Sequence, residues 1–186
     1  MKNFKIAMTL TLVITMVPFL GSCKNETKNE NRTVNKLAKK EKKLLSEAET
    51  SNSVILINDY LDLKNALVAD NSLEATKSAK KILDALAHFD PSGYPEKQIE
   101  LKHILGDLKV YSEEIAMSEG KLQHQREQFE MLSKNMLALI KITGSDKTLY
   151  QDFCPMFNNG KGAVWLSEMK EIKNPYYGRK MPGCGR

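Results

Sequence analysis

The sequence contains little of the chemistry on which most enzymes depend. It has only three histidines, which fall on separate predicted helices without metal-ligand spacing: His88, His103 and His124. Adjacent carboxylates, such as Glu113 and Glu114, point apart on a helix. No glycine-rich phosphate loop follows a strand, and no Ser-His-Asp order has a supporting motif. We therefore expect no enzymatic activity, and we expect the histidines to be exposed or to lie at helix ends.

An excess of basic residues is also absent from residues 44–186, which include the whole of the predicted helical domain. The formal net charge is +5, but Lys2, Lys5 and residues 23–43 account for all of the excess. Residues 44–186 contain 18 lysines and arginines against 20 aspartates and glutamates. Because the basic character belongs to a tail, we expect no nucleic-acid partner.

Long apolar runs are absent after residue 22. Residues 1–22 have a basic start, an apolar run and small residues at the end, and the run is too short for a membrane span, so the pattern indicates a secretory signal peptide. The stretch Leu20-Gly21-Ser22-Cys23 resembles the bacterial lipobox, in which the cysteine is lipidated after cleavage. Lipidated Cys23 would attach the protein to a membrane surface. The alternative is an ordinary cleaved signal with a coincidental cysteine.

The predicted export determines the compartment of the remaining cysteines. Lys24 follows Cys23, which by resemblance to lipoprotein sorting rules favours the outer membrane, so we expect a lipid-anchored cell-envelope protein that faces the periplasm or lies at the outer membrane. Residues 23–53 are polar and basic, and they predict a tether because they bury too little apolar area to order themselves. Cys154 and Cys184 remain as a pair where thiols oxidise or bind metal.

From residue 54 onward, apolar residues recur at helical spacing. The first predicted helix covers residues 54–69 and follows Ser51-Asn52-Ser53, which is a fair N-cap. A second helix begins at Asn71, whose pairing with Glu74 resembles a capping box. Turn residues 89–95 then separate the second helix from the third.

The third predicted helix runs from residue 96 to about 118, and the fourth runs from Leu122 to a stop at Gly144. Gly120 alone is a soft break, so one long kinked helix is the alternative for this pair. No strand-like alternation competes with the helical pattern. Four amphipathic helices with short polar breaks predict an all-α fold, an up-down four-helix bundle, within residues 54–186.

The last segment, residues 150–186, departs from the helical pattern and predicts an irregular loop that caps the bundle. A Cys-x-Met (Cys154, Met156) opens the loop, and a Met-x-x-Cys (Met181, Cys184) closes it. If the two cysteines meet, each methionine is only two or three residues away. Two thiolates with two thioethers form a soft metal site, which favours copper(I) over calcium, magnesium or manganese. Zinc is less apt because methionine is not among its usual ligands.

A disulfide between Cys154 and Cys184 is the alternative to a metal site. It would close a loop of about 31 residues and contribute roughly 3 to 4 kcal/mol through chain entropy. Met156 and Met181 would then fill gaps in the core, whereas a metal site would have Met169 as a spare ligand. The two hypotheses are not exclusive over time, since oxidation of the pair would switch off a copper(I) site.

Three stretches of the chain carry a resemblance to a known family. They are "YLDLKNALVA" at residues 60–69, "QREQFEMLSKNMLAL" at residues 125–139, and residues 149–185. The most specific part is an ordered set in the last stretch: Tyr150, Cys154-Pro155-Met156, Gly162, Trp165-Leu166-Ser167, Asn174-Pro175-Tyr176-Tyr177-Gly178, Met181 and Cys184-Gly185. On these residues, the chain resembles the bacterial family named domain of unknown function 3347 over essentially all of residues 54–186.

The resemblance implies a helical bundle and a link to copper or other heavy-metal handling. Family members occur alone behind lipoprotein signals, or fused to or encoded near heavy-metal efflux adaptors, but this chain lacks the adaptor portions, so transport itself is not implied. We therefore predict an extracytoplasmic lipoprotein that binds or buffers a soft metal ion, most simply copper(I). The alternative is a disulfide-stapled interaction module that docks an efflux or envelope component.

Overall fold

The structure is a computed structural model that describes residues 52–186. A first helix covers residues 52–68, called helix 52–68 below. Three further α-helices follow: α2 (Ser72–Ala87), α3 (Gln98–Ala116) and α4 (Leu122–Thr143). The remaining elements are two strands and three short 3-10 helices: β1 (Tyr150–Cys154), β2 (Ala163–Ser167), η1 (Pro91–Gly93), η2 (Pro95–Lys97) and η3 (Gly178–Lys180). The predicted signal peptide (residues 1–22), the predicted lipidation site Cys23 and the tether up to residue 51 lie outside the described residues.

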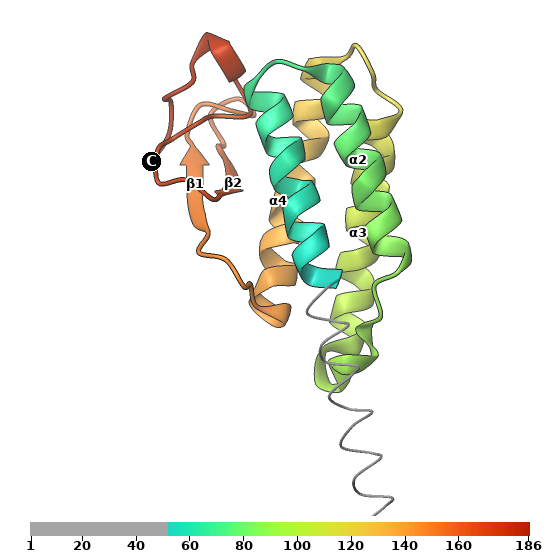
Figure 1. The fold of residues 1–186 in the computed structure, drawn as a ribbon. Helices are drawn as coiled ribbons and strands as arrows, with labels where there is room; N and C mark the ends of the chain where they lie inside the picture. Colours follow the sequence, from blue (N-terminus) through green and yellow to red (C-terminus); the bar gives the residue numbers. More distant parts are fainter. Residues whose placement is uncertain (1–51) are drawn as a thin grey trace, which may run out of the picture. The chain divides into compact units, whose positions relative to one another are not determined.

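The four helices of the described region lie side by side and run in alternating directions (Figure 1). Their apolar faces form one core, and its fully buried members include Leu56, Tyr60, Leu63, Leu67, Ile82, Leu101, Leu108, Phe129, Leu132 and Leu139. Burial of one such side chain contributes about 1.5–3 kcal/mol. The prediction of a helical bundle is confirmed, and its stability comes from the periodic apolar positions.

A polar N-cap and two glycines lie at helix boundaries that the sequence predicts. The side chain of Asn71 accepts a hydrogen bond of 3.1 Å from the backbone N–H of Glu74, which is the predicted start of α2. Gly144, with φ of 77°, follows α4 as its C-cap. Gly120 lies in the turn between α3 and α4 with φ of 79°. The third and fourth predicted helices are therefore two separate helices.

Two predicted helix boundaries are wrong. Helix 52–68 already includes Asn52 and Ser53, which the sequence pattern assigns to the cap and the tether. Ser53 is only 5% exposed, and the Asn52 side chain donates a hydrogen bond of 2.9 Å to the carbonyl of His88. Because of these tertiary contacts, residues 52 and 53 belong to the first helix and not to the tether. At the third helix, residues 95–97 form a separate 3-10 turn, so α3 begins at Gln98.

The largest departure from prediction is a β-hairpin in residues 150–186, for which the sequence predicts an irregular loop. Strands β1 and β2 pair antiparallel, with Asp152 opposite Trp165 and Cys154 opposite Ala163. Each strand has five residues, and four of the five in β2 are buried. Strands this short, with one of them buried on both faces, give no period-two alternation to detect. The described fold is therefore mostly helical with a small two-stranded sheet.

Backbone groups on both outer edges of the hairpin have hydrogen-bond partners. On β1, Phe153 exchanges two backbone hydrogen bonds with Arg186, of 2.9 and 3.1 Å. On β2, the Leu166 N–H donates to the hydroxyl of Tyr60 at 3.0 Å. The hydroxyl of Tyr176 donates to a β2 carbonyl two residues before Leu166. The hairpin packs through β2 against α4.

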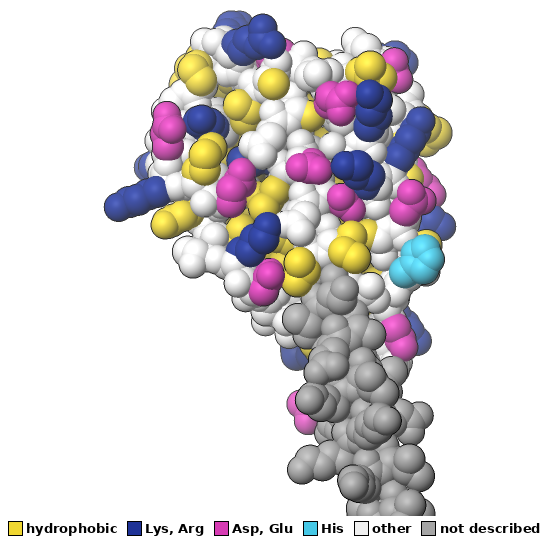
Figure 2. Space-filling model, viewed as in Figure 1, with side chains coloured by type: hydrophobic (Ala, Val, Ile, Leu, Met, Phe, Trp, Pro, Cys, Tyr) yellow, Lys and Arg dark blue, Asp and Glu magenta, His cyan; other side chains and the backbone are white. Residues whose placement is uncertain are grey.

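The surface mixes charges of both signs. On the face drawn in Figure 2, Lys and Arg side chains alternate with Asp and Glu side chains, and isolated apolar side chains lie between them. Among residues 52–186, no helix has both the length and the apolar character needed to cross a membrane.

Candidate functional site

The two cysteines of the C-terminal segment lie next to each other. Cys154 ends β1 and is fully buried, whereas Cys184 is partly exposed near the end of the chain. Both are free thiols. Burial, followed by the charge of Cys154 and a hydrogen bond with it, raises the pKa of the Cys184 thiol. The structure therefore brings together the two sulfur atoms that open and close this segment.

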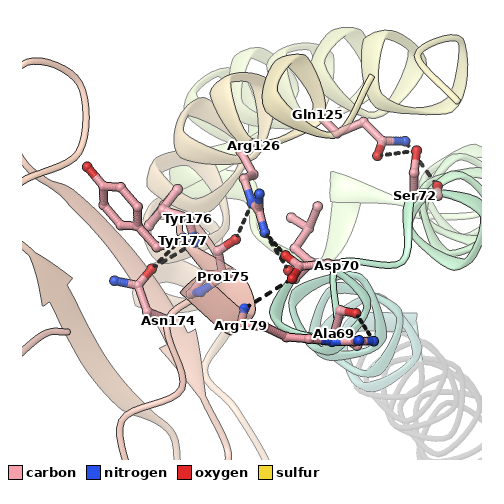
Figure 3. Close-up of polar contacts among 11 residues, drawn as sticks. Ala69, Asp70, Ser72, Gln125, Arg126, Asn174, Pro175, Tyr176, Tyr177 and Arg179 are labelled. Carbon is pink, nitrogen blue, oxygen red and sulfur yellow. Dashed lines mark hydrogen bonds and ion pairs between the residues drawn. The ribbon is translucent and has the colours of Figure 1, made fainter. Parts of the chain in front are cut away.

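Asn174 holds the end of the chain in this position. Its side chain is fully buried, and Nδ2 donates a hydrogen bond of 2.6 Å to the carbonyl of Cys184. Its Oδ1 accepts hydrogen bonds from the backbone N–H groups of Tyr176 and Tyr177, at 2.8 and 3.2 Å (Figure 3). An asparagine that bonds to the backbone two and three residues ahead fixes a turn. One amide thus connects the aromatic turn to the second cysteine.

The residues that flank the two cysteines also meet. The backbone pair between Phe153 and Arg186 lies next to the thiols, and the Arg186 guanidinium lies 5.3 Å from the centroid of the Phe153 ring. A Cβ atom at Gly185 would lie 2.9 Å from the Trp165 ring. These contacts set the approach of the last residues to β1, and with it the approach of the thiols.

The methionines of the predicted metal site lie in turns beside the cysteines. Met156 follows β1 and is 43% exposed, and its carbonyl accepts a hydrogen bond of 3.1 Å from the Tyr177 hydroxyl. Met181 follows η3 and is half-buried, and its carbonyl accepts the N–H of Cys184 at 3.3 Å. Met169 follows β2, where its N–H donates to the side chain of Ser167 at 3.1 Å.

The donor set built around this contact consists of two thiols. Within residues 52–186, no group of three or more His, Cys, Asp or Glu side chains could hold a metal ion. A tetrahedral zinc site made of these residue types is therefore not built here. Two adjacent sulfurs, with thioethers in the neighbouring turns, suit copper(I). Because the pKa of Cys184 is raised, a metal would have to displace a proton from this thiol, so metal affinity would increase with pH.

A buried arginine on α4 connects the C-terminal segment to the bundle (Figure 3). Arg126 donates through Nε to the carbonyl of Pro175 at 2.8 Å and through Nη2 to the carbonyl of Leu67 at 3.0 Å. The same Nη2 forms an ion pair with Asp70. Asp70 also accepts the backbone N–H of Arg179 at 3.2 Å. One guanidinium therefore joins α4, the end of helix 52–68 and the turn before η3.

Gly178 lies against this arginine cluster. Its φ is 54°, in the left-handed region that favours glycine. A Cβ atom at this position would clash with the side chains of Asp70 and Arg126. Gly178 therefore allows the backbone of the C-terminal segment to approach the ion pair.

The hydroxyl of Tyr60 forms a second connection between the bundle and the hairpin. It shares a hydrogen bond of 2.9 Å with the Ser133 hydroxyl on α4, in which either group can donate, and it accepts the Leu166 N–H on β2 at 3.0 Å. Burial raises the pKa of Tyr60 far above its ordinary value, although both hydrogen bonds oppose this shift. The ring stacks on Phe129 with centroids 5.4 Å apart, and Phe129 in turn lies 5.7 Å from Tyr176.

A third connection is a charged cluster around Lys64. This fully buried lysine lies 3.2 Å from a carboxylate oxygen of Glu168, and Asn65 donates to the other oxygen at 3.2 Å. Burial favours a higher pKa for Glu168, but hydrogen bonds from its own backbone and from Asn65, together with Lys64, lower it. For Asp152, which is 5% exposed, burial raises the pKa and the charge of Lys64 opposes the shift. The positive charge of the buried Lys64 thus favours the ionised form of two carboxylates, that of Asp152 in β1 and that of Glu168 directly after β2.

The role of these connecting residues was not predicted from the sequence, although the sequence carries a signal of buried polar contacts. Tyr60, Lys64 and Leu67 share one helix face, so Lys64 interrupts an apolar stripe. On α4, Gln125 lies in the apolar register and is fully buried, and it donates to the carbonyl of Ser72 at 3.2 Å. A polar residue inside an apolar stripe indicates a buried polar contact, but it does not identify the partner.

The histidines lie at the surface or at a helix end. His88 is the C-cap of α2, and His103 is exposed on α3. His124 lies 3.6 Å from Glu114 and 3.7 Å from Glu127. Its contact with Glu114 links α4 to α3, which spacing within one helix does not reveal.

The comparisons with known proteins concern the helices. The model of the family described as Protein of unknown function (DUF3347) matches residues 56–148, which is half of the chain. The match ends before β1, so residues 150–186, with the most specific part of the resemblance, lie outside it. Neither a curated protein nor a solved structure matches the chain.

Proposed function

Because the chain belongs to the DUF3347 family of proteins of unknown function, we propose its function from the site itself: binding or buffering of a soft metal ion, copper(I) first. The observation that carries this proposal is the contact between the free thiols of Cys154 and Cys184. The two residues are 30 positions apart in the sequence. The hydrogen bond from Asn174 to Cys184, the backbone pair between Phe153 and Arg186, and the close approach of Gly185 to the Trp165 ring position the two segments that carry them.

The chemistry of the donors favours copper(I) over harder cations. Thiolates and thioethers are soft ligands, which copper(I) prefers, whereas calcium and magnesium prefer oxygen. Met156 and Met181 supply thioethers from turns that adjoin the two cysteines. Cys154 is fully buried and Cys184 partly buried, so the surrounding protein would limit access of water and oxidants to the metal.

The proposed location is the cell envelope. A signal peptide over residues 1–22, followed by lipidation at Cys23, would attach the protein to a membrane, and residues 24–51 would precede the described domain as a tether. The partners would be the membrane, through the lipid, and a component of the envelope or of heavy-metal efflux.

Competition for copper(I) tests the proposal. The full-length protein, reduced and kept free of oxygen, should withdraw one copper(I) per chain from a colorimetric copper(I) chelator. The Cys184→Ser variant should lose at least about 100-fold in affinity, since changes to groups that only support ligands already cost 10–100-fold. The double variant Met156→Leu with Met181→Leu should bind more weakly than the parent while it retains the helical circular dichroism spectrum.

Met131→Leu is the matched control, because Met131 lies on α4 within the helical bundle. It should leave copper(I) affinity unchanged. If Cys184→Ser and the parent compete equally well with the chelator, the proposal is wrong. If only the methionine pair proves dispensable, the thiols alone hold the metal.

The second candidate is a disulfide-stapled interaction module, and the same contact favours it. Neighbouring thiols can oxidise with little movement of the backbone. Protein isolated from the cell envelope should then show no free thiol and no bound metal, and it should unfold at a lower temperature after reduction. Two free thiols together with stoichiometric copper in the native protein would exclude the staple.

A further inference from the structure

The solvent-facing side of α3 carries a heptad pattern whose residues do not belong to the buried core of the bundle. The core face of α3 consists of Leu101, Ile104, Leu108, Ser112 and Ile115. On the opposite side, six positions follow one another at alternating spacings of four and three: Ile99, His103, Gly106, Val110, Glu113 and Met117. This spacing is that of the a and d positions through which two helices pair. We call these six residues the α3 seam.

The apolar members of the α3 seam are unusually exposed. Ile99, Val110 and Met117 are 77%, 52% and 72% exposed, and they are three of the seven large hydrophobic residues that are exposed in the described region. At the centre of the seam, a Cβ atom added to Gly106 would have no atom within 4 Å. A glycine in a helix interior disfavours the helix, and no packing among residues 52–186 requires it. Its absent side chain permits close approach of another helix.

Charges on the two flanks of the seam have opposite signs. Glu100, Asp107 and Glu114 follow one another at intervals of seven and occupy the e positions. Lys102 and Lys109 are also seven residues apart and occupy g positions on the other flank. In coiled coils, e and g charges determine partner and orientation.

From this arrangement, we propose that α3 docks against α3 of a second copy of this chain, with the two helices parallel. In a parallel pair, each g position faces the e position five residues further along in the other helix. Lys102 would then face Asp107 of the second copy, and Lys109 would face Glu114 of the second copy. An antiparallel pair would set the acidic flanks against each other and the lysines against each other, so the charges disfavour it.

The ion pairs that these flanks form within one chain do not prevent docking. Lys109 lies 3.9 Å from Glu113, and Glu100 lies 2.9 Å from Lys97, with all four side chains about half exposed or more. Glu114 lies 3.6 Å from His124 of α4, and these two side chains are 46% and 39% exposed. Exposed pairs of this kind contribute little stability, so they can exchange for contacts between copies.

The seam is short and mixed, so the association is weak and depends on local concentration. The residues from 99 to 117 span about 27 Å of helix, and His103, Gly106 and Glu113 replace apolar residues at half of the seam positions. Attachment of both copies to one membrane, which rests on the proposed lipid at Cys23, would raise their effective concentration. The parallel orientation itself follows from the charges and not from the anchor.

Sedimentation equilibrium of the full-length protein in detergent micelles tests whether the seam mediates self-association. We expect a concentration-dependent dimer, which Val110→Asp should weaken about tenfold or more because a charge replaces an a-position residue. Leu73→Asp is the matched control, since Leu73 is an apolar residue of α2 with 46% exposure that lies outside the seam. A chain that stays monomeric at every concentration, or equal losses in the two variants, would overturn the proposal.

Charge exchange tests the parallel orientation. The double variant K102E with K109E should lose self-association about tenfold or more, and so should D107K with E114K, because each makes both flanks alike in sign. An equimolar mixture of the two double variants should associate again as a mixed dimer. If neither double variant associates more weakly than the parent, the parallel arrangement is wrong. Circular dichroism should show unchanged helix content throughout, since none of the four positions belongs to the buried face of α3, and the contact of Glu114 with His124 of α4 involves two partly exposed side chains.

Discussion

The helical bundle and the C-terminal segment of this protein are held by different kinds of interaction. In the bundle, aliphatic side chains at helical spacing form a shared core. Residues 150–186 depend instead on aromatic contacts, such as that between Trp165 and Tyr176 at 5.9 Å, and on buried polar groups that bind backbone atoms. Asn174 and Arg126 are examples of such groups. A core of interchangeable aliphatic residues tolerates substitution, whereas a single buried polar group has no equivalent replacement.

The two regions can be observed separately in one experiment. The four helices of the described residues dominate the far-ultraviolet circular dichroism. The only tryptophan of the chain, Trp165, lies in β2 and is fully buried, so its fluorescence reports on the C-terminal segment. Circular dichroism therefore follows the bundle, and tryptophan fluorescence follows the C-terminal segment.

The largest effect should follow the removal of Trp165. Trp165→Ala should lower the free energy of unfolding by about 3–5 kcal/mol, because a large buried side chain leaves a cavity. Urea unfolding followed by circular dichroism measures the loss. Trp165→Phe should cost less, since it retains most of the apolar volume. A loss below about 1 kcal/mol for the alanine variant would show that the segment adds little to the bundle.

Loss of Arg126 should separate the two regions. Arg126→Ala removes the ion-pair partner of Asp70 and one hydrogen-bond donor from each of the carbonyls of Leu67 and Pro175, so we expect a loss of about 3 kcal/mol. The tryptophan transition should then occur at lower urea concentration than the helical transition. Arg179→Ala is the control, because Arg179 is exposed and donates to one carbonyl, that of Ala69; its cost should stay below about 1 kcal/mol. Coincident transitions in the Arg126 variant would contradict a separate role for this residue.

Tyr60→Phe should have a smaller effect on the same connection. The ring still stacks on Phe129, but the hydrogen bonds with Ser133 and with the Leu166 N–H are lost. We expect a cost of about 1–2 kcal/mol in urea unfolding. Tyr150→Phe, on the exposed start of β1, should change the free energy of unfolding by less than about 0.5 kcal/mol. Equal effects in both variants would rule out the hydroxyl of Tyr60 as a specific link.

The smallest effect concerns pH. The pKa of Glu168 is lowered from its ordinary value of 4.5, so the ionised form stabilises the fold; this contribution is present above pH 4.5 and is lost as the pH falls through the folded-state pKa. The stability difference between the parent and Glu168→Gln should therefore shrink in acid. Because Glu168 is about one-third exposed, the pH-dependent part should not exceed about 1 kcal/mol. Glu171→Gln is the control, because the Glu171 side chain is 76% exposed, and it should change the free energy of unfolding by less than about 0.5 kcal/mol.

The bundle could be predicted because its determinants repeat along the chain. Apolar spacing, the Asn71 cap and Gly144 are local signals, and the helices form where these signals indicate. The contact between Cys154 and Cys184 could also be proposed, since both residues bracket one segment. The hairpin could not be predicted, because its five-residue strands give no detectable period. Arg126 could be seen as a polar residue, but its partners at positions 67, 70 and 175 are distant in sequence and depend on the tertiary fold.

The hydroxyl groups of Tyr60 and Tyr176 have one more consequence for the hairpin. They occupy the backbone N–H of Leu166 and the backbone carbonyl of Val164, and the last residue of the chain occupies the same groups of Phe153 on the opposite side. A strand whose outward amides are already engaged offers no template for another chain, which is the usual first step of edge-to-edge aggregation. The phenol groups of Tyr60 and Tyr176 and the backbone of Arg186 therefore block the addition of another strand at these positions.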